Sequence, residues 1–188
     1  MVAAEKSDEE IAEAVQKGDH ESFGILVERY EQKISRYGRK FLSDAEDIKD
    51  LIQEIFIKAY VNIRSFDTER KFSPWIYRIA HNEFINAAQK KRRIPIFSFD
   101  LDTIFPHPVA AETADSEARR HDMRKILDMH LGSLLLKYRE PLILYYFQDM
   151  DYKMISEILK IPTSTVGVRL QRGKALLEQR IGRDNPIV

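Results

Sequence analysis

The side chains of this sequence best suited to chemistry are hydroxyls, amides and guanidinium groups on a basic segment near the C-terminus. A helix is predicted there from Thr163 to Arg180. Hydroxyls and backbone amides at a helix N-terminus anchor phosphates, and Arg or Gln farther along can reach base edges in a major groove. The candidate contacts on or near its outer face are Thr163, Ser164, Thr165, Val168, Arg169, Gln171, Arg172 and Lys174.

The elements around this helix complete a helix-turn-helix pattern. Asp151 is a candidate N-cap for a short helix over residues 152–160, and Ile161-Pro162 turns the chain. Ser156 supplies the small residue that is needed where two such helices cross closely. A plain helical hairpin with a solvated basic face is the alternative, but cap, turn, small residue and basic helix together favour binding to duplex DNA.

A second basic helix is predicted from Pro74 to Arg93, with Ser73 as its N-cap and Pro74 at its first position. Amide and guanidinium side chains share one face and lead to a basic cluster, which suits unstacked bases better than duplex. These side chains are Arg78, Asn82, Asn86, Gln89, Lys90, Lys91, Arg92 and Arg93. Phe72, Trp75 and Tyr77 are aromatic candidates for base stacking, although a lone Trp is more often a core residue.

A third helix, predicted over residues 44–63, has apolar residues on two sides. One complete core-facing stripe consists of Ile48, Leu51, Ile52, Ile55, Phe56, Ala59, Tyr60 and Ile63. Ile57 and Val61 lie opposite that stripe, in register with Asp50, Gln53 and Glu54. Scattered apolar surface residues are common, so a solvated face and a protein-docking face stand as alternatives at this point.

Helical periodicity runs through nearly the whole sequence, so we expect an all-α protein. Residues 94–116 break the pattern with three prolines, several acids and no period, which indicates an acidic linker longer than an ordinary loop. We therefore expect two small helical domains, over residues 7–93 and 117–183, joined by a flexible linker.

The composition of the chain limits the classes of protein to which it can belong. The 188 residues contain 30 Lys and Arg against 30 Asp and Glu, but the basic residues concentrate in two blocks, 71–93 and 160–183, as expected for a polyanion contacted at two places. The chain has no cysteine, an acidic start and no apolar run of membrane-spanning length, which favours the cytoplasm without membrane insertion. The five histidines show no metal-ligand spacing and no glycine-rich phosphate loop exists, so we expect no metal, no cofactor and no enzymatic activity.

Three stretches, taken together in this order, resemble the extracytoplasmic-function (ECF) sigma factors of bacterial RNA polymerase. "DLIQEIFIKAY" is similar to region two-point-two of that family, and "FSPWIYRIAHNEFINAAQKKRR" is similar to regions two-point-three and two-point-four. "YREPLILYYFQDMDYKMISEILKIPTSTVGVRLQRGKALL" is similar to region four. Each stretch alone is moderately specific, whereas all three in sequence are highly specific.

The resemblance implies partners for the surfaces described above. Asp50, Gln53, Glu54 and Ile57 would dock on the β′ clamp coiled coil of core RNA polymerase, with the β flap as a second contact. The minus-ten contacts implied, to melted single-stranded DNA and its backbone, are Ser65, Phe66, Asp67, Lys71, Arg78, Asn82, Asn86, Lys90, Lys91, Arg92 and Arg93. The helix from Thr163 would enter the major groove of the minus-thirty-five duplex. The family commonly has an anti-sigma factor as a further partner.

One departure and one alternative qualify the resemblance. Family members often carry a basic residue after the Thr-Val at the start of the recognition helix, where this chain has Gly167. A glycine inside a helix costs roughly 1 kcal/mol relative to alanine and offers no side chain to DNA. The alternative is a helix-turn-helix regulator that binds duplex without polymerase, and the Asp50 to Ile57 face distinguishes the two because such a regulator does not need it.

Overall fold

The computed structural model describes residues 6–90, 127 and 129–184 of the chain. The chain divides into two compact units, formed mainly by residues 1–93 and by residues 94–188, and each is described by itself. All regular structure in the described residues is helical, which confirms the expected all-α class with two helical domains. The predicted linker over 94–116 and the basic residues Lys91, Arg92 and Arg93 lie outside the described part of the chain.

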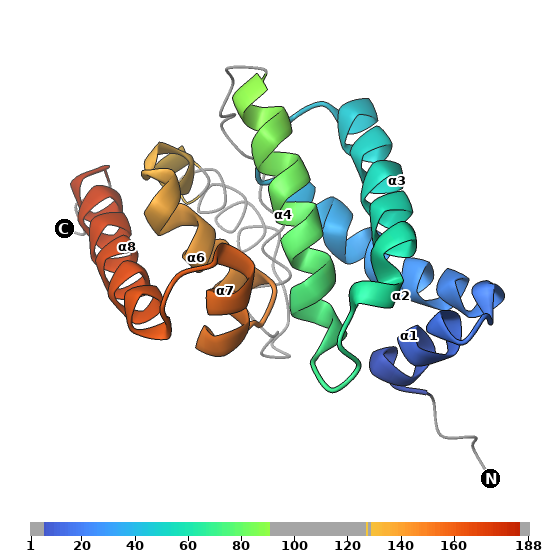
Figure 1. Ribbon diagram of the computed structural model, residues 1–188. Helices are drawn as coiled ribbons and strands as arrows, with labels where there is room; N and C mark the ends of the chain where they lie inside the picture. The colour runs from blue at the N-terminus through green and yellow to red at the C-terminus, as the bar shows by residue number, and fades with distance from the viewer. Residues whose placement is uncertain (1–5, 91–126, 128, 185–188) are drawn as a thin grey trace, which may run out of the picture. The chain divides into compact units, whose positions relative to one another are not determined.

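The N-terminal unit is a bundle in which α2 contacts α1, α3 and α4 (Figure 1). Its elements are α1 (Asp8–Gln16), η1 (His20–Ser22), α2 (Phe23–Gly38), α3 (Ala45–Asn62), η2 (Ile63–Ser65) and α4 (Phe72–Lys90). Ser7 and Glu10 form a capping box that begins α1, with the Ser7 amide donating to Glu10 Oε2 at 2.7 Å. Asp44 begins α3 by accepting from the amides of Glu46 and Asp47.

The core of the bundle lies between α2, α3 and α4 and is rich in aromatic rings. Tyr37 packs edge to face against Phe41, with ring centroids 4.9 Å apart, and Phe41 stacks on Phe84 at 6.2 Å. A Cβ atom on Gly38 would lie 2.5 Å from Phe84 Cζ, so only glycine permits this close approach of α2 to α4. This packing fixes α4 against α2 and therefore fixes which face of α4 is left exposed.

The C-terminal unit contains α6 (Leu136–Phe147), α7 (Tyr152–Leu159) and α8 (Thr163–Asp184). Asp151 begins α7 as predicted, because its carboxylate accepts from the Met154 amide at 2.8 Å. The turn then passes through Lys160, whose φ of 52° is left-handed, and the Ser156 hydroxyl donates to the Ile161 carbonyl at 2.6 Å. Helix α8 packs on α6, as Figure 1 shows. The unit therefore contains the predicted helix-turn-helix.

Candidate functional site

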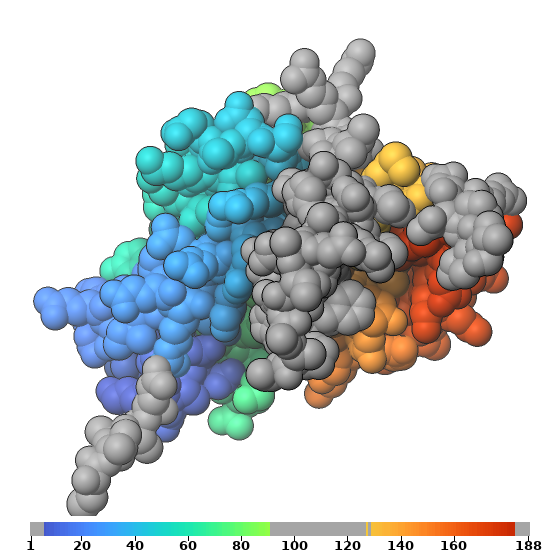
Figure 2. Space-filling model, turned by 180° about the vertical axis from the view of Figure 1, so that it is seen from behind, coloured from blue at the N-terminus to red at the C-terminus, as the bar shows by residue number. Residues whose placement is uncertain are grey.

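The outer face of α3 carries the apolar residues that the core does not use. Ile57 is 63% exposed and Val61 is 72% exposed, whereas Ile55 and Ala59 on the inner face are fully buried. Asp50, Gln53 and Glu54 are exposed as well, so the structure brings the predicted docking residues together on one solvent-facing side of α3. Figure 2 shows the surfaces of α2 and α3, in blue to teal, adjoining on one side of the molecule. Of the predicted core stripe, Leu51 is only half-buried, and Tyr60 is 38% exposed, with its hydroxyl hydrogen-bonded to His20.

The loop between α3 and α4 combines exposed polar residues with a buried aromatic anchor. Ser65, Asp67 and Lys71 are exposed. Phe66 is only 5% exposed, and its ring lies 5.3 Å from the rings of both Phe72 and Trp75. Phe66 therefore supports the loop from the core side, while its polar neighbours occupy the surface.

Helix α4 exposes the amide face that the sequence predicts. Asn82, Asn86 and Lys90 are exposed, and Arg78 is half-buried. The interpretation of Phe72 and Tyr77 as base-stacking rings is wrong, because both are buried, at 1% and 2% exposure. Tyr77 packs edge to face against Tyr37 at 5.4 Å, and burial raises its pKa. Trp75 is half-buried, which leaves part of its ring at the surface.

Helix α8 presents a mixed polar face from its first residue onward. Val166 and Leu170 are buried, which turns the intervening positions outward. Exposed residues of that face are Thr163, Ser164, Val168, Gln171, Arg172 and Lys174, and half-buried ones are Thr165 and Arg169. A Cβ atom on Gly167 would meet the Tyr152 ring at 3.4 Å, an ordinary van der Waals contact. No steric requirement therefore demands glycine at that position.

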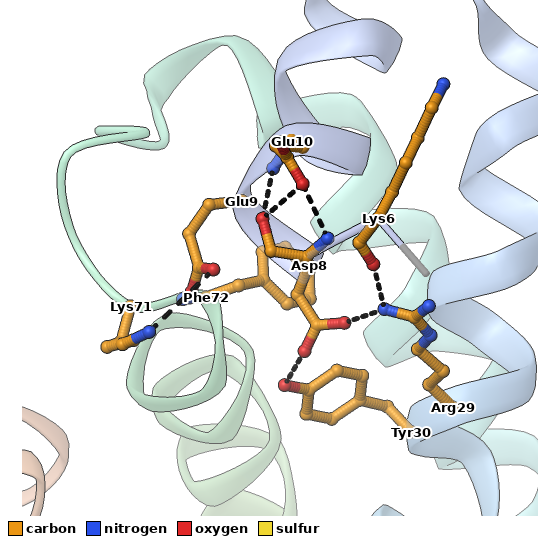
Figure 3. A network of polar contacts seen from close by, with 9 residues as sticks. Lys6, Asp8, Glu9, Glu10, Arg29, Tyr30, Lys71 and Phe72 are labelled. Carbon is orange, nitrogen blue, oxygen red and sulfur yellow. Dashed lines mark hydrogen bonds and ion pairs between the residues drawn. The ribbon is translucent and has the colours of Figure 1, made fainter. Parts of the chain in front are cut away.

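Sequence reasoning missed the side chains that hold the loop between α3 and α4. Gln16 Nε2 donates to the carbonyls of Ile63 and Phe66, both at 2.8 Å. At the other end of the loop Glu9 Oε1 accepts from the Phe72 amide at 3.0 Å (Figure 3). No local sequence pattern signals these contacts, because the partners are far apart along the chain.

The start of α4 also differs from the expected one, because a residue far away along the chain contacts it. The helix begins at Phe72, so Ser73 and Pro74 lie inside its first turn and the prediction of Ser73 as N-cap is wrong. The carboxylate of Glu9 bonds one of the helix amides that would otherwise have no partner. A side chain from α1 thus performs the capping that the sequence suggested for a local serine.

Two buried titratable groups stabilise the frame of the site. Burial, together with its hydrogen bond to Asp8, raises the pKa of Tyr30, so its hydroxyl stays protonated and donates to Asp8 Oδ2 at 2.6 Å. Burial lowers the pKa of His81 to about 4, and its Nδ1 is hydrogen-bonded to the Tyr37 hydroxyl at 2.8 Å. Among the residues described, no group of three or more His, Asp or Glu side chains could hold a metal ion. None of the helices described is long and apolar enough to cross a membrane.

Comparison with known proteins identifies both halves of the chain. Residues 26–94 match the family Sigma-70 region 2, and residues 124–177 match Sigma-70, region 4. The ECF RNA polymerase sigma factor SigW of Bacillus subtilis is 34% identical over 89% of this chain and 92% of its own length. The ECF RNA polymerase sigma-E factor of Haemophilus influenzae is 31% identical over 96% of this chain and 98% of its own.

Solved structures agree with the fold. A structure of CnrH in complex with the cytosolic domain of CnrY has a TM-score of 0.70 at 21% identity, covering 96% of this chain and all of that one. The sigma factor RpoE in complex with the anti-sigma factor NepR, from Bartonella quintana, has a TM-score of 0.63 at 19% identity, covering 87% of this chain and 98% of that one. The two family matches and the full-length relatives favour the sigma factor over a free helix-turn-helix regulator. The chain belongs to the ECF sigma factors, which direct RNA polymerase in transcription initiation.

Proposed function

We propose that this sigma factor divides promoter-specific initiation among three surfaces. The outer face of α3 docks on the β′ clamp coiled coil of core RNA polymerase, and the C-terminal unit contacts the β flap. The loop after α3 and the amide face of α4 hold the melted minus-ten strand. The exposed face of α8 reads the minus-thirty-five element as duplex.

The observation that carries the proposal is the second apolar set on α3. Ile57 and Val61 are among the most exposed large hydrophobic side chains of the described residues, although α3 already buries an apolar stripe on its other side. Apolar side chains flanked by Asp50 and Glu54 suit a partner that offers both apolar area and basic groups. A DNA-binding regulator without polymerase gains nothing from such a surface.

The two DNA surfaces differ in chemistry. Asn82 and Asn86 on α4 are exposed amides, able to pair with base edges that have left the stack. Ser65, Asp67, Lys71 and half-buried Arg78 surround the buried Phe66, and Lys90 extends the same helix face toward the phosphates. On α8, the hydroxyls of Thr163 and Ser164 precede Gln171 and Arg172, as suits phosphate anchoring followed by base contact.

Three variants tested in three assays separate the surfaces. Gln53→Ala with Ile57→Asp should weaken binding to core RNA polymerase, measured by fluorescence anisotropy. Asn82→Ala should reduce open-complex formation while core binding is retained. Arg172→Ala should weaken binding to upstream-element duplex by roughly 1–3 kcal/mol, as expected for loss of a base-edge contact.

The matched control for the docking variant is Ile25→Asp. Ile25 is also an exposed apolar residue of the N-terminal unit, at 40%, but it lies on α2. The Ile25→Asp variant therefore introduces the same new charge, but its affinity for core RNA polymerase should be unchanged. Unchanged core affinity in the Ile57 variant, or equal loss in both, would remove the docking face from the proposal.

The remaining partners follow from the family. One structural neighbour, the sigma factor RpoE of Bartonella quintana, is named as a complex with the anti-sigma factor NepR, which supports an anti-sigma factor as a regulator of this chain. Action on the chromosome places the proposed function in the cytoplasm. The chain is proposed to bind and to melt DNA with polymerase while carrying out no covalent chemistry itself.

A further inference from the structure

Three successive acids at the start of α1 each contact a different part of the N-terminal unit (Figure 3). Asp8 accepts from Arg29 Nη1 and from the Tyr30 hydroxyl, both at 2.6 Å, which attaches α1 to α2. Glu10 closes the capping box of α1 itself. Glu9 alone reaches the start of α4, where it accepts from the Phe72 amide at 3.0 Å. The first turn of α1 is thus connected both to the bundle and to the end of the loop.

The last residue of α1 contacts the beginning of the same loop. Gln16 Nε2 donates to the carbonyl oxygens of Ile63, the first residue of η2, and of Phe66, the residue that directly follows η2. The two NH protons of one side-chain amide suffice for both bonds. Helix α1 therefore spans the loop and bonds its backbone at both ends.

We propose that Glu9 and Gln16 are positioning residues for recognition of the minus-ten strand. They fix the backbone of the loop from residue 63 to residue 72, so that Ser65, Asp67 and Lys71 face the solvent in one arrangement before DNA arrives. The inference rests on the proposed minus-ten role of this loop, and it adds a role for α1, which itself presents no residue to the strand. Preorganisation of this kind raises affinity because less conformational entropy is lost on binding.

The distances indicate that the backbone contact of Glu9 is its important one. Lys71 Nζ lies 4.0 Å from Glu9 Oε2, and the Lys71 side chain is 71% exposed, so that ion pair contributes little. The bond to the Phe72 amide is shorter, part-buried and made by a charged acceptor, the stronger class of hydrogen bond. Lys71 is consequently left available for a phosphate. Glutamine at position 9 keeps an acceptor oxygen for the amide, whereas alanine removes it.

The chain provides its own reporter of loop position. Trp75 is its single tryptophan, and its ring lies 5.3 Å from the Phe66 ring and 5.5 Å from the Phe72 ring. Both neighbours belong to residues that α1 holds through their backbone. We expect Glu9→Ala and Gln16→Met to shift the emission maximum of Trp75 and to lower its anisotropy in the free chain, with the far-ultraviolet circular dichroism unchanged. Glu9→Gln should leave the emission as in the wild type.

The DNA measurement uses each full-length variant assembled with bacterial core RNA polymerase. The probe is a labelled single-stranded oligonucleotide whose hexamer has been selected from a random pool by the wild-type holoenzyme. Glu9→Ala and Gln16→Met should each weaken probe binding about tenfold, the expected order for loss of bonds that hold a binding loop. Glu9→Gln should restore binding to within about twofold, and affinity for core polymerase should stay constant in all variants.

Two controls separate the inference from a general weakening of the fold. Glu13→Ala removes another acid of α1, one that pairs with Lys17 on the exposed side, and should change neither Trp75 emission nor probe binding. Asn82→Ala reports on the proposed strand contact itself. Probe binding lost in Asn82→Ala but retained in Glu9→Ala and Gln16→Met would overturn the inference and leave the minus-ten assignment standing. Probe binding retained in all three would overturn both.

Discussion

The loop before α4 and the turn before α8 both face the proposed DNA side of their units, but side chains at very different sequence distances hold them in place. Bonds to the first loop come from Gln16 and Glu9, which are 47 to 63 residues away from their partners. In the C-terminal unit Asp151 bonds Met154 and Ser156 bonds Ile161, across three and five residues. The bonds to the first loop can exist only once the bundle has formed. The bonds in the C-terminal unit join residues of one short segment and need no tertiary packing.

This difference suits the two kinds of DNA that we propose for the surfaces. A major groove offers a regular shape, which one rigid helix with local caps can enter. A melted strand has no fixed shape, so the protein must supply the geometry, and a loop held from outside itself can do so. Local contacts thus suffice in the C-terminal unit, while the N-terminal unit depends on tertiary packing. Changes to packing should therefore affect the first loop most.

The largest expected effect comes from Gly38, where α2 approaches α4 across the core. Gly38→Ala places a methyl group 2.5 Å from Phe84 Cζ, and overpacking of this kind costs about 1–3 kcal/mol. The loss should appear in urea unfolding followed by Trp75 fluorescence, which reports on the N-terminal unit. Gly24→Ala is the matched control, since a Cβ atom there meets nothing within 4 Å. That substitution in the same helix should be stabilising, and destabilisation by both would contradict the packing argument.

Acidification should change the free energy of unfolding of the two units in opposite directions. Burial lowers the pKa of His81 to about 4 from the usual 6.5, so the unfolded state binds the extra proton first and stability is lost as pH falls from 6.5 toward 4. Between pH 7.5 and pH 5 the N-terminal unit should lose about 2 kcal/mol. Trp75-monitored urea unfolding at the two pH values measures this loss. His81→Gln should remove it, and a pH-dependent loss that persists in that variant would exclude His81 as its source.

The C-terminal unit should respond to acid in the opposite direction. Burial raises the pKa of Glu140 to about 7, although Arg139 and Arg169 oppose the shift. Its contribution to stability is therefore fully present below pH 4.5 and is lost as pH rises through 7. Urea unfolding followed by circular dichroism reports on both units, and Trp75 fluorescence only on the N-terminal one. The circular dichroism transition that has no counterpart in the fluorescence should therefore have a higher urea midpoint at pH 5. Glu140→Gln should abolish that movement, and equal acid sensitivity in both units would contradict the contrast.

The same contrast explains which features the sequence could predict. The all-α class, the Asp151 cap and the exposed α3 face follow from spacing within one or two helical turns, and the structure contains all three. Ser73 satisfies the local preference for an N-cap, but tertiary packing places Glu9 against the Phe72 amide instead. From the sequence Tyr77 and Phe72 are only candidates for stacking, because no periodicity distinguishes an aromatic core face from an aromatic binding face.

A smaller effect tests the local hydrogen bonds of the C-terminal unit. Asp151→Ala removes the carboxylate that accepts from the Met154 amide, and loss of such an N-cap costs about 1 kcal/mol. Amides in the first turn of α7 should exchange faster with solvent by hydrogen-exchange mass spectrometry, while those of α4 are unchanged. Asp151→Asn, which keeps a capping oxygen, should restore protection. Faster exchange in α4 as well would show that the two units are not independently held.

The smallest effect concerns Gly167, and it tests whether α8, the proposed recognition helix, is less stable than it could be because a side chain is absent where DNA would approach. Gly167→Ala should stabilise the C-terminal unit by up to about 1 kcal/mol, because the added methyl group meets Tyr152 at an ordinary 3.4 Å. Gly173→Ala on the same helix should be destabilising, since its Cβ atom would lie 3.0 Å from Leu142 and 3.2 Å from the Tyr138 carbonyl. Both are measured by urea unfolding with circular dichroism.

Duplex binding of the Gly167 variant then decides what the glycine is for. Weaker binding by the more stable protein would mean that the absent side chain leaves room for the DNA at that point of α8. Unchanged binding would mean that position 167 does not touch the groove, and that specificity rests on Gln171 and Arg172, one turn farther along the helix. In either case the effect should stay within the C-terminal unit, because the residue lies in a segment whose geometry is fixed by its own neighbours.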